Sequence, residues 1–249
     1  MKHKGSFDYC YNGQISVDSK DQIIVSQHLT QNENDKNELK AALADIKDNT
    51  GVLPDKISLD KGYMTAENIL VLSANKIDGY IATGRGEKDK PDDNAKKIIK
   101  AHFSYDESKD EFICPAGVVL KLKSIGKNRG YRAAAKACSE CACQKSCYAC
   151  KNNIPTMCTD DKGILIAAMA QKMRSNSSKE IYAKRKIIVE PVFGQIKNSG
   201  FRRFSLRGFK KAGGEFSLIC SVLNFKKIVK QIKAQINTPL ERELVPAIT

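Results

Sequence analysis

The sequence predicts an α/β fold that is interrupted by a small β-rich insertion. Strand-type and helix-type runs alternate through residues 1–85, hairpin patterns and clustered cysteines fill residues 86–172, and helical patterns fill residues 173–236. We therefore expect a body made from the first and third segments, with the second segment inserted between them. Residues 237–249 form a loose tail in this interpretation.

The first segment opens with two short β-type runs, Gln14–Val17 and Gln22–Ser26. The polar residues between them favour a turn, so the pair predicts an antiparallel hairpin. Asn34 or Asp35 can then cap a helix that ends near Asp48. Apolar residues at helical spacing predict the buried face of this helix: Leu39, Ala42, Leu43 and Ile46.

A short strand, Lys56–Leu59, leads directly to Asp60. A carboxylate at the C-terminal end of a strand projects into the crevice where open α/β sheets bind ligands. The alternative is that Asp60 caps the following turn. Thr65 can cap a helix that runs to about Asn75, and Gly79–Thr83 is another strand.

The character of the chain changes at Gly84, where a charged stretch rich in breakers predicts a linker that reaches Asn94. Phe103–Tyr105 and Glu111–Ile113 flank a polar turn and predict a second hairpin. Two further strands are expected nearby, at Val118–Leu122 and Gly130–Arg132.

Seven of the nine cysteines lie within this insertion, residues 86–172. Two pairs, Cys138 with Cys141 and Cys147 with Cys150, have the two-residue spacing that lets both thiolates reach one tetrahedral metal. Together they form one candidate ligand set for zinc, and free thiols packed as small hydrophobes are the alternative. A structural zinc would stabilise an insertion too small for a large core.

The last third of the body is helical. A helix is expected over Asp160–Lys172, and residues 176–178 can cap a second helix that carries Glu190. Pro191 must kink or restart that helix, because it has no amide hydrogen to donate. In the final helix we expect one buried face, made by Phe216, Ile219, Val222, Leu223, Ile228 and Ile232.

Positive charge is concentrated near the C-terminal end. Residues 174–234 hold 15 Lys and Arg against 3 Asp and Glu, whereas the whole chain has a net charge of +14. This asymmetry predicts a polyanionic partner, nucleic acid before a membrane surface. No signal peptide is evident and no window approaches the roughly 18 apolar residues of a membrane span, so we expect a reducing cytoplasm and no membrane partner.

One stretch, Tyr182–Lys197, holds a single acid among cations and aromatics. At about 100° per residue, five of its residues share one helical face: Tyr182, Lys186, Glu190, Phe193 and Lys197. An oxygen ligand for a hard cation beside positive charge suits a metal-bound phosphate. A basic surface helix with one salt-bridged Glu is the alternative.

This stretch resembles the Tyr–Arg–Glu–Lys signature of DDE transposases from bacterial insertion sequences. Tyr182 to Arg185 and Glu190 to Lys197 have the family spacing, but Arg185 lies one residue too far from Glu190, which leaves Arg185 or Lys186 as the basic partner. Two other segments agree: residues 57–63, with Asp60 before Gly-Tyr, and residues 200–208. The resemblance covers about residues 9–230.

The resemblance implies a ribonuclease-H-like domain that lacks its first strand, split by the insertion into residues 1–85 and 173–236. Asp60 and Glu190 would be the second and third catalytic carboxylates, which hold two Mg²⁺ or Mn²⁺ ions about 4 Å apart. The first carboxylate is not found, because Asp8 is the only acid before the hairpin and lies in the segment that leads into it.

The resemblance also implies ligands and contacts. The preferred zinc set becomes Cys114, Cys138, Cys141 and Cys147, because the family's insertion carries cysteines in that arrangement. DNA phosphates near the transposon end would be contacted by Tyr182, Arg185 or Lys186, and Lys197. The arginine forks of the following loop, Arg202, Arg203 and Arg207, also suit phosphates.

The expected function is therefore that of a DDE transposase domain: DNA binding, with metal-dependent cleavage and strand transfer at insertion-sequence ends. With the first Asp missing, the chain is expected to be an inactive C-terminal fragment, unless a homodimer or the absent N-terminal part completes the site. The rival hypotheses are a non-catalytic, zinc-stabilised nucleic-acid-binding protein and a nuclease of the same fold.

Overall fold

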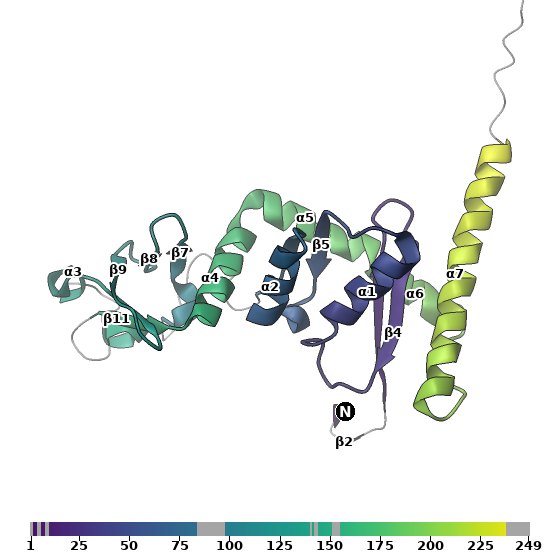
Figure 1. The fold of residues 1–249 in the computed structure, drawn as a ribbon, viewed down its shortest axis with the longest axis horizontal. Coiled ribbons are helices and arrows are strands. Elements are labelled where there is room, and N and C mark those ends of the chain that lie inside the picture. Colours follow the sequence, from purple (N-terminus) through teal and green to yellow (C-terminus); the bar gives the residue numbers. More distant parts are fainter. Residues whose placement is uncertain are drawn as a thin grey trace, which may run out of the picture.

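The computed structural model describes residues 2–3, 6–7, 10–83, 98–139, 141, 144–150 and 155–237. A central α/β body carries a β-rich region at one end and a long helix at the other (Figure 1). Three sequence-based expectations lie outside the described residues: the role of Asp8, the linker 84–94 and the tail from 238 onward.

Two pairs of strands form the body. The predicted hairpin is confirmed as β3 (Asn12–Val17) and β4 (Ile24–Thr30), which are antiparallel. β5 (Lys56–Leu59) and β6 (Asp78–Ile81) form a parallel pair. Among the described residues the two pairs share no ladder, although both pack near α1 (Leu39–Thr50). Two further two-residue strands pair near the N-terminus, β1 (Lys2–His3) and β2 (Ser6–Phe7).

Helix α1 buries the face that the sequence predicts. Its buried residues are Leu39, Ala42, Leu43 and Ile46. The predicted start was wrong, because the helix begins at Leu39 with Glu38 as its N-cap and without a side-chain capping bond. Asp35 instead accepts hydrogen bonds from β3, and its carboxylate is therefore engaged away from the helix end.

The following elements match the sequence more closely. Asp60 ends β5 and caps a short 3₁₀ turn, η1 (Lys61–Tyr63). Thr65 caps α2 (Ala66–Ala74) by accepting from the Asn68 amide, as predicted. The turn and the helix then carry the chain back to β6.

The insertion is a five-stranded antiparallel sheet in the order β11-β10-β9-β8-β7. Its elements are η2 (Lys100–His102), β7 (Ser104–Asp106), β8 (Glu111–Ile113), β9 (Val119–Ser124), β10 (Arg129–Arg132), α3 (Ala135–Ser139), η3 (Gln144–Ser146), η4 (Tyr148–Cys150) and β11 (Thr156–Thr159). β11 was not predicted, because Met157 is the only large apolar residue among the polar Thr156, Cys158 and Thr159. Met157 packs with Phe112 and Tyr131 in a core of the insertion's own.

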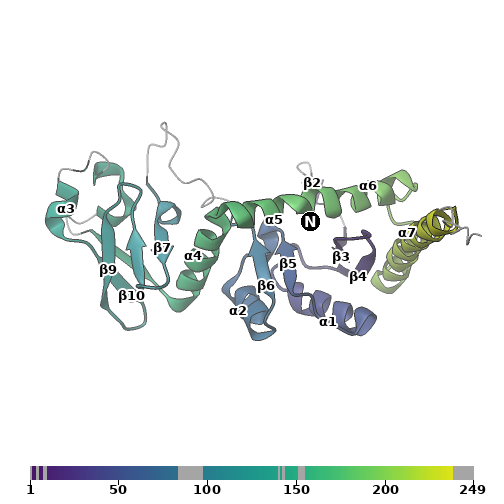
Figure 2. The ribbon, with the colours of Figure 1, turned by 90° about the horizontal axis from the view of Figure 1, so that it is seen from above.

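Three helices lead back along the body, as Figure 2 shows. Asp160 caps α4 (Asp161–Arg174) and Ser175 caps α5 (Asn176–Ile188) through side-chain hydrogen bonds. The predicted restart at Pro191 is confirmed, because α6 (Glu190–Asn198) begins there with Pro191 in its first turn. Glu190 is therefore the first residue of a new helix rather than part of α5.

The final helix, α7 (Phe209–Asn237), packs one face on the hairpin. Phe216, Cys220 and Leu223 are buried there, and the Asn224 side chain exchanges hydrogen bonds with both backbone groups of Ile24. The prediction of the buried face was wrong for three of its six residues. Val222, Ile228 and Ile232 are exposed, because they lie away from the hairpin.

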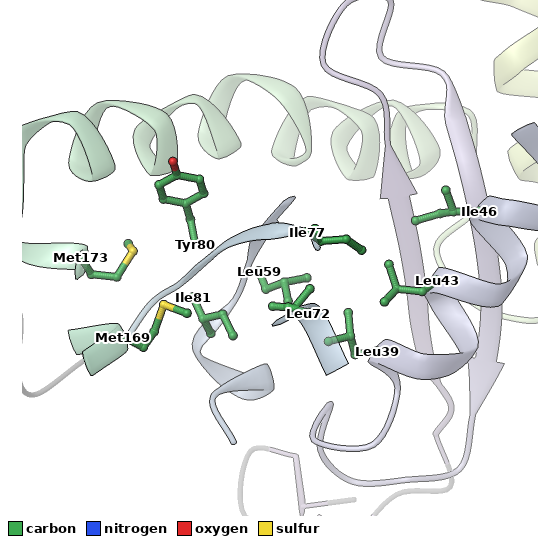
Figure 3. Packing of buried hydrophobic residues seen from close by; sticks show 10 residues of the cluster. All are labelled: Leu39, Leu43, Ile46, Leu59, Leu72, Ile77, Tyr80, Ile81, Met169 and Met173. Carbon is green, nitrogen blue, oxygen red and sulfur yellow. The ribbon is translucent and has the colours of Figure 1, made fainter. Parts of the chain in front are cut away.

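The main core joins the two halves of the body. Figure 3 shows α1, β5, α2 and β6 contributing side chains that meet Met169 and Met173 of α4. Ile81 is fully buried in this cluster and Leu72 is 2% exposed. Residues on both sides of the insertion thus share one apolar cluster.

The burial of Leu72 gives a test of this core. Leu72→Ala should lower the free energy of unfolding by about 2–5 kcal/mol, because it removes buried methyl groups and leaves a cavity. Leu70→Ala on the same helix is the control, since Leu70 is 54% exposed. Urea titration followed by circular dichroism measures both variants, and equal losses would contradict the assignment of Leu72 to the core.

Candidate functional site

Asp60 stands where β5 ends, and its carboxylate has two partners. Its Oδ1 accepts from the Lys61 amide at 2.7 Å, which is the predicted capping alternative. Its Oδ2 lies 3.1 Å from Arg185 Nη2. Because half of the side chain is still exposed, Asp60 both caps the turn and presents an oxygen to solvent.

Arg185 is the point where the two motif segments meet. It lies on α5, which packs over β5 and β6, and its side chain is 22% exposed. Lys186, the other candidate, is exposed. The structure therefore brings Arg185, 125 residues away in sequence, to the acid that the sequence analysis singled out.

A polar network fixes the turn that follows Asp60. Tyr63 Oη donates to Gln14 on β3, and Gln14 Nε2 donates to Asp35 Oδ1 at 2.6 Å. Asn12 Nδ2 donates to the same oxygen at 2.7 Å. Gly62 is required here, because an added Cβ would stand 2.5 Å from Asp35 Oδ2.

Two acids of this region were missed by sequence reasoning. Burial raises the pKa of Tyr63, and the negative charges of Asp35, Glu38 and Asp60 raise it further, while Arg185 opposes them. The carboxylates of Asp35, Glu38 and Asp60 therefore all lie close enough to the Tyr63 phenol to raise its pKa. Only the folding of the loop before α1 brings them there, and no local motif marks them.

Glu190 is exposed at the start of α6, five residues beyond Arg185. Within the described ranges, no three or more His, Cys, Asp or Glu side chains form a group that could hold a metal ion. Asp60 and Glu190 have the oxygen chemistry that Mg²⁺ prefers, but two carboxylates fall short of a two-metal site. The fit is incomplete, and no step through a metal follows from it.

The predicted DNA-contacting residues fall into two groups. Tyr182 is half-buried and packs against the main core. The others are exposed: Lys186, Lys197, Arg202, Arg203 and Arg207. The cationic side chains are therefore open to a polyanion, whereas the tyrosine ring is mainly a packing group.

The loop that carries the three arginines is held in place from below. Phe204 packs edge-on against Phe201, with ring centroids 5.2 Å apart, and against Tyr11 at 5.6 Å. The Glu215 carboxylate accepts from the Ser205 and Leu206 amides, which lowers the pKa of Glu215. Anchored phenyl rings and a pinned backbone keep the arginines on the surface.

Five thiols surround one pocket of the insertion. Cys114, Cys138, Cys141, Cys147 and Cys150 all line it. Burial raises the pKa of Cys150 to about 12, and hydrogen bonding to Cys138 and the nearby Cys147 thiol add to the effect. Cys150, absent from the preferred ligand set, therefore belongs to the cluster, although the described thiols are not arranged as a ready-made metal site.

Glu38 makes the stability of the fold depend on pH. Burial alone would raise its pKa, but hydrogen bonds from Asn32, His28 and Thr30 outweigh this effect and lower it. A depressed carboxyl pKa stabilises the fold above the ordinary value of 4.5, and this stabilisation is lost as the pH falls through the folded-state pKa.

We therefore expect Glu38→Gln to cost about 1–3 kcal/mol of unfolding free energy at pH 7, where the ionised group makes charge-assisted bonds. The loss should shrink when unfolding is repeated in acid, below the ordinary pKa. Glu33→Gln is the control, because Glu33 is exposed. A penalty that stays constant with pH would show that the ionised form of Glu38 is not what stabilises the loop.

Comparison with known proteins gives one similarity. Residues 113–229, slightly less than half of the chain, match the family model described as "Transposase DDE domain", and this match supports a DDE-type transposase region there. The matched segment contains Glu190 and the cysteine cluster, while Asp60 lies before it. No curated protein and no solved structure matches the chain.

Proposed function

We propose that this chain is a DDE transposase domain of ribonuclease-H-like fold, whose catalytic half is residues 1–85 together with 173–236 and whose insertion is residues 86–172. DDE transposase regions act on DNA and use divalent metals. The observation that carries the proposal is the Asp60–Arg185 ion pair. This ion pair joins Asp60, at the end of β5, to helix α5, which leads to Glu190. The two segments that resemble the family thus lie in contact.

Among the described residues the set of acids at Asp60 is incomplete, which supports a domain that needs a further strand. β3 and β5 each have an edge without a partner strand among the described residues. One additional strand pairing with both would join the two strand pairs into a single sheet, and an acid on it would stand beside Asp60. We propose that the N-terminal part of a transposase, or a second chain, supplies this strand, and that the chain alone does not cut DNA.

In a complete site, Asp60 and Glu190 are the residues of this chain that would hold divalent metal ions, which would supply Lewis-acid chemistry at a phosphodiester. Arg185 fixes the Asp60 carboxylate, and the network through Tyr63 fixes the turn behind it. Asp60 would thus be oriented before DNA arrives, whereas Glu190 is exposed at the start of α6.

DNA is the proposed partner, because the exposed cations lie on α5, α6 and the arginine loop (residues 200–208), on the side of the chain with the excess positive charge. Arginine forks pair with phosphates in a bidentate manner, and they give affinity without base specificity. No helix in the described part of the chain is both long and apolar enough to cross a membrane.

Salt-dependent binding tests the DNA surface. Replacing Arg202, Arg203 and Arg207 together by Ala should weaken binding of a fluorescent 30-base-pair duplex (a probe length of about three helical turns) by at least about tenfold, and lower the slope of log K against log salt by about 3. Replacing Lys121, Lys123 and Lys127 of the insertion removes the same charge and is the control. Equal losses in both variants would mean that only net charge matters.

The same chain tests catalysis when it is incubated with labelled duplex and Mg²⁺ or Mn²⁺. We expect binding without cleavage, and the same binding in Asp60→Asn and Glu190→Gln. Robust cleavage that Asp60→Ala abolishes would contradict the need for a further strand while supporting the catalytic role of Asp60. Failure of the chain to bind DNA would overturn the functional proposal itself.

The thiol cluster favours a second candidate role for the insertion, a zinc-stabilised module. Cobalt added to the reduced chain should give thiolate charge-transfer absorbance, and Cys138→Ser and Cys150→Ser should remove most of it. Affinity should fall as the pH is lowered, because the high thiol pKa means that protons must leave. Cys158→Ser is the control, since Cys158 is exposed and does not line the pocket. Absence of charge-transfer bands would leave the cysteines as packed thiols.

A further inference from the structure

The final helix, α7, has two polar flanks, one on either side of its buried face. On the flank toward β4, every seventh residue is held by a side-chain hydrogen bond to the hairpin: Ser217, Asn224 and Gln231. Lys227 reaches the hairpin as well, because its Nζ donates to the Gln22 carbonyl. The hairpin therefore satisfies the polar side chains of this flank.

The other flank carries positive charge. Three lysines of α7 are exposed there: Lys226, Lys230 and Lys233. At about 100° per residue they lie within roughly 60° of one another and roughly 150° from the flank that is bonded to the hairpin. Within the described ranges, no hydrogen bond or ion pair engages their ammonium groups. We call these three residues the α7 lysine row.

The arginine loop is attached to the same flank as the lysine row. Glu215 stands about three helical turns before Lys226, so the two side chains leave α7 within roughly 20° of each other. The Glu215 carboxylate accepts from the Ser205 and Leu206 amides at 3.0 and 3.1 Å. Figure 2 shows α6, which leads into the loop, reaching α7 from a different side than β4. The loop and the lysine row therefore lie along one side of the helix.

Together the loop and the row form a cationic track. From Glu215 to Lys233 the helix rises roughly 27 Å at 1.5 Å per residue. At 3.4 Å per base pair, this rise corresponds to about eight base pairs of duplex DNA. Glu215 is the only acidic residue of α7, and its carboxylate is bonded to the two amides of the loop. No other acid of the helix opposes a polyanion along this track.

We propose that the α7 lysine row is a second phosphate-binding site, which extends the contact of the arginine loop along one DNA duplex. The inference rests on the proposed function, because it takes duplex DNA as the partner. A duplex carries one negative charge per roughly 1.7 Å of its axis, so ammonium groups on flexible stems meet phosphates in any register. Such contacts add affinity without reading bases.

Continuity with the arginine loop favours a duplex over a membrane surface as the partner of the row. Helix α6 leads from Glu190 to the loop, and α7 leads from the loop to the row. DNA that reached Glu190 and passed over the loop would therefore continue onto α7, where the row would hold the duplex beyond the acids. Figure 1 shows the C-terminal half of α7 extending past the hairpin strands.

Fluorescence anisotropy with the same duplex that tests the arginine loop also tests the row. Replacing all three lysines of the row by Gln should weaken binding by about five- to tenfold and lower the slope of log K against log salt by about 3, since each phosphate contact accounts for about one unit. The matched control replaces three exposed lysines of the insertion by Gln and should change both values little: Lys121, Lys123 and Lys127. Thermal unfolding checks that both variants are folded.

Photo-cross-linking tests which flank of α7 faces the duplex. Benzoylphenylalanine in place of Lys233 should cross-link to bound DNA on irradiation, whereas the same group in place of Gln235 should not. The two positions are both exposed and point roughly 160° apart on the helix. The pair therefore separates a contact along the lysine row from a general attraction of α7 to DNA.

The outcomes distinguish this inference from the proposed function. Unchanged binding by the lysine-row variant, equal losses in the two Gln variants, or equal cross-linking from both positions would overturn the row and leave the arginine loop as the DNA contact. Loss of binding to phosphatidylserine vesicles in the lysine-row variant, without loss of DNA binding, would assign the row to a membrane surface and also overturn it. A chain that binds no duplex at all would overturn the functional proposal itself.

Discussion

The packing of α4 against α2 and β6 is the contact on which the rest of the structure depends. Met169 and Met173 enter the main core, and between them Lys172 reaches back to β6. Its Nζ donates to Asp78 and, at 2.7 Å, to the Gly79 carbonyl, and lies 4.3 Å from the centre of the Tyr80 ring. Burial of the methionines fixes the position of α4, and the lysine selects its register along the strand.

The docking of α4 determines where α5 places Arg185 relative to Asp60. α5 follows α4 after the single cap residue Ser175, so the direction of α5 over β5 is set where α4 docks. Arg185 then reaches Asp60, although an entire sheet with its own core separates the two in sequence. The insertion can therefore vary or bind metal without moving the acids, provided that α4 remains seated.

The chain divides its positive charge and its apolar surface between different faces. The arginines of the loop before α7 are held by aromatic anchors and by Glu215, while exposed apolar residues of α7, such as Leu218 and Phe225, lie away from the hairpin.

Local patterns determined the strand that ends at Asp60, the Thr65 cap, the buried face of α1 and the restart at Pro191, because each depends on neighbours within one or two turns. They also selected Asp60 as a candidate, and the family resemblance left Arg185 or Lys186 as the basic partner. Tertiary structure alone decided that Asp60 and Arg185 pair, that Asp35 and Glu38 act on Tyr63, and that one pocket is lined by both Cys114 and Cys150, which belonged to alternative sets, since those contacts join segments far apart in the chain. The same holds for α7, which has apolar residues on two faces, and only the position of the hairpin shows which face is buried. Sequence fixes periodicity and chemistry, but the partner of each face depends on packing over distances that no local window covers.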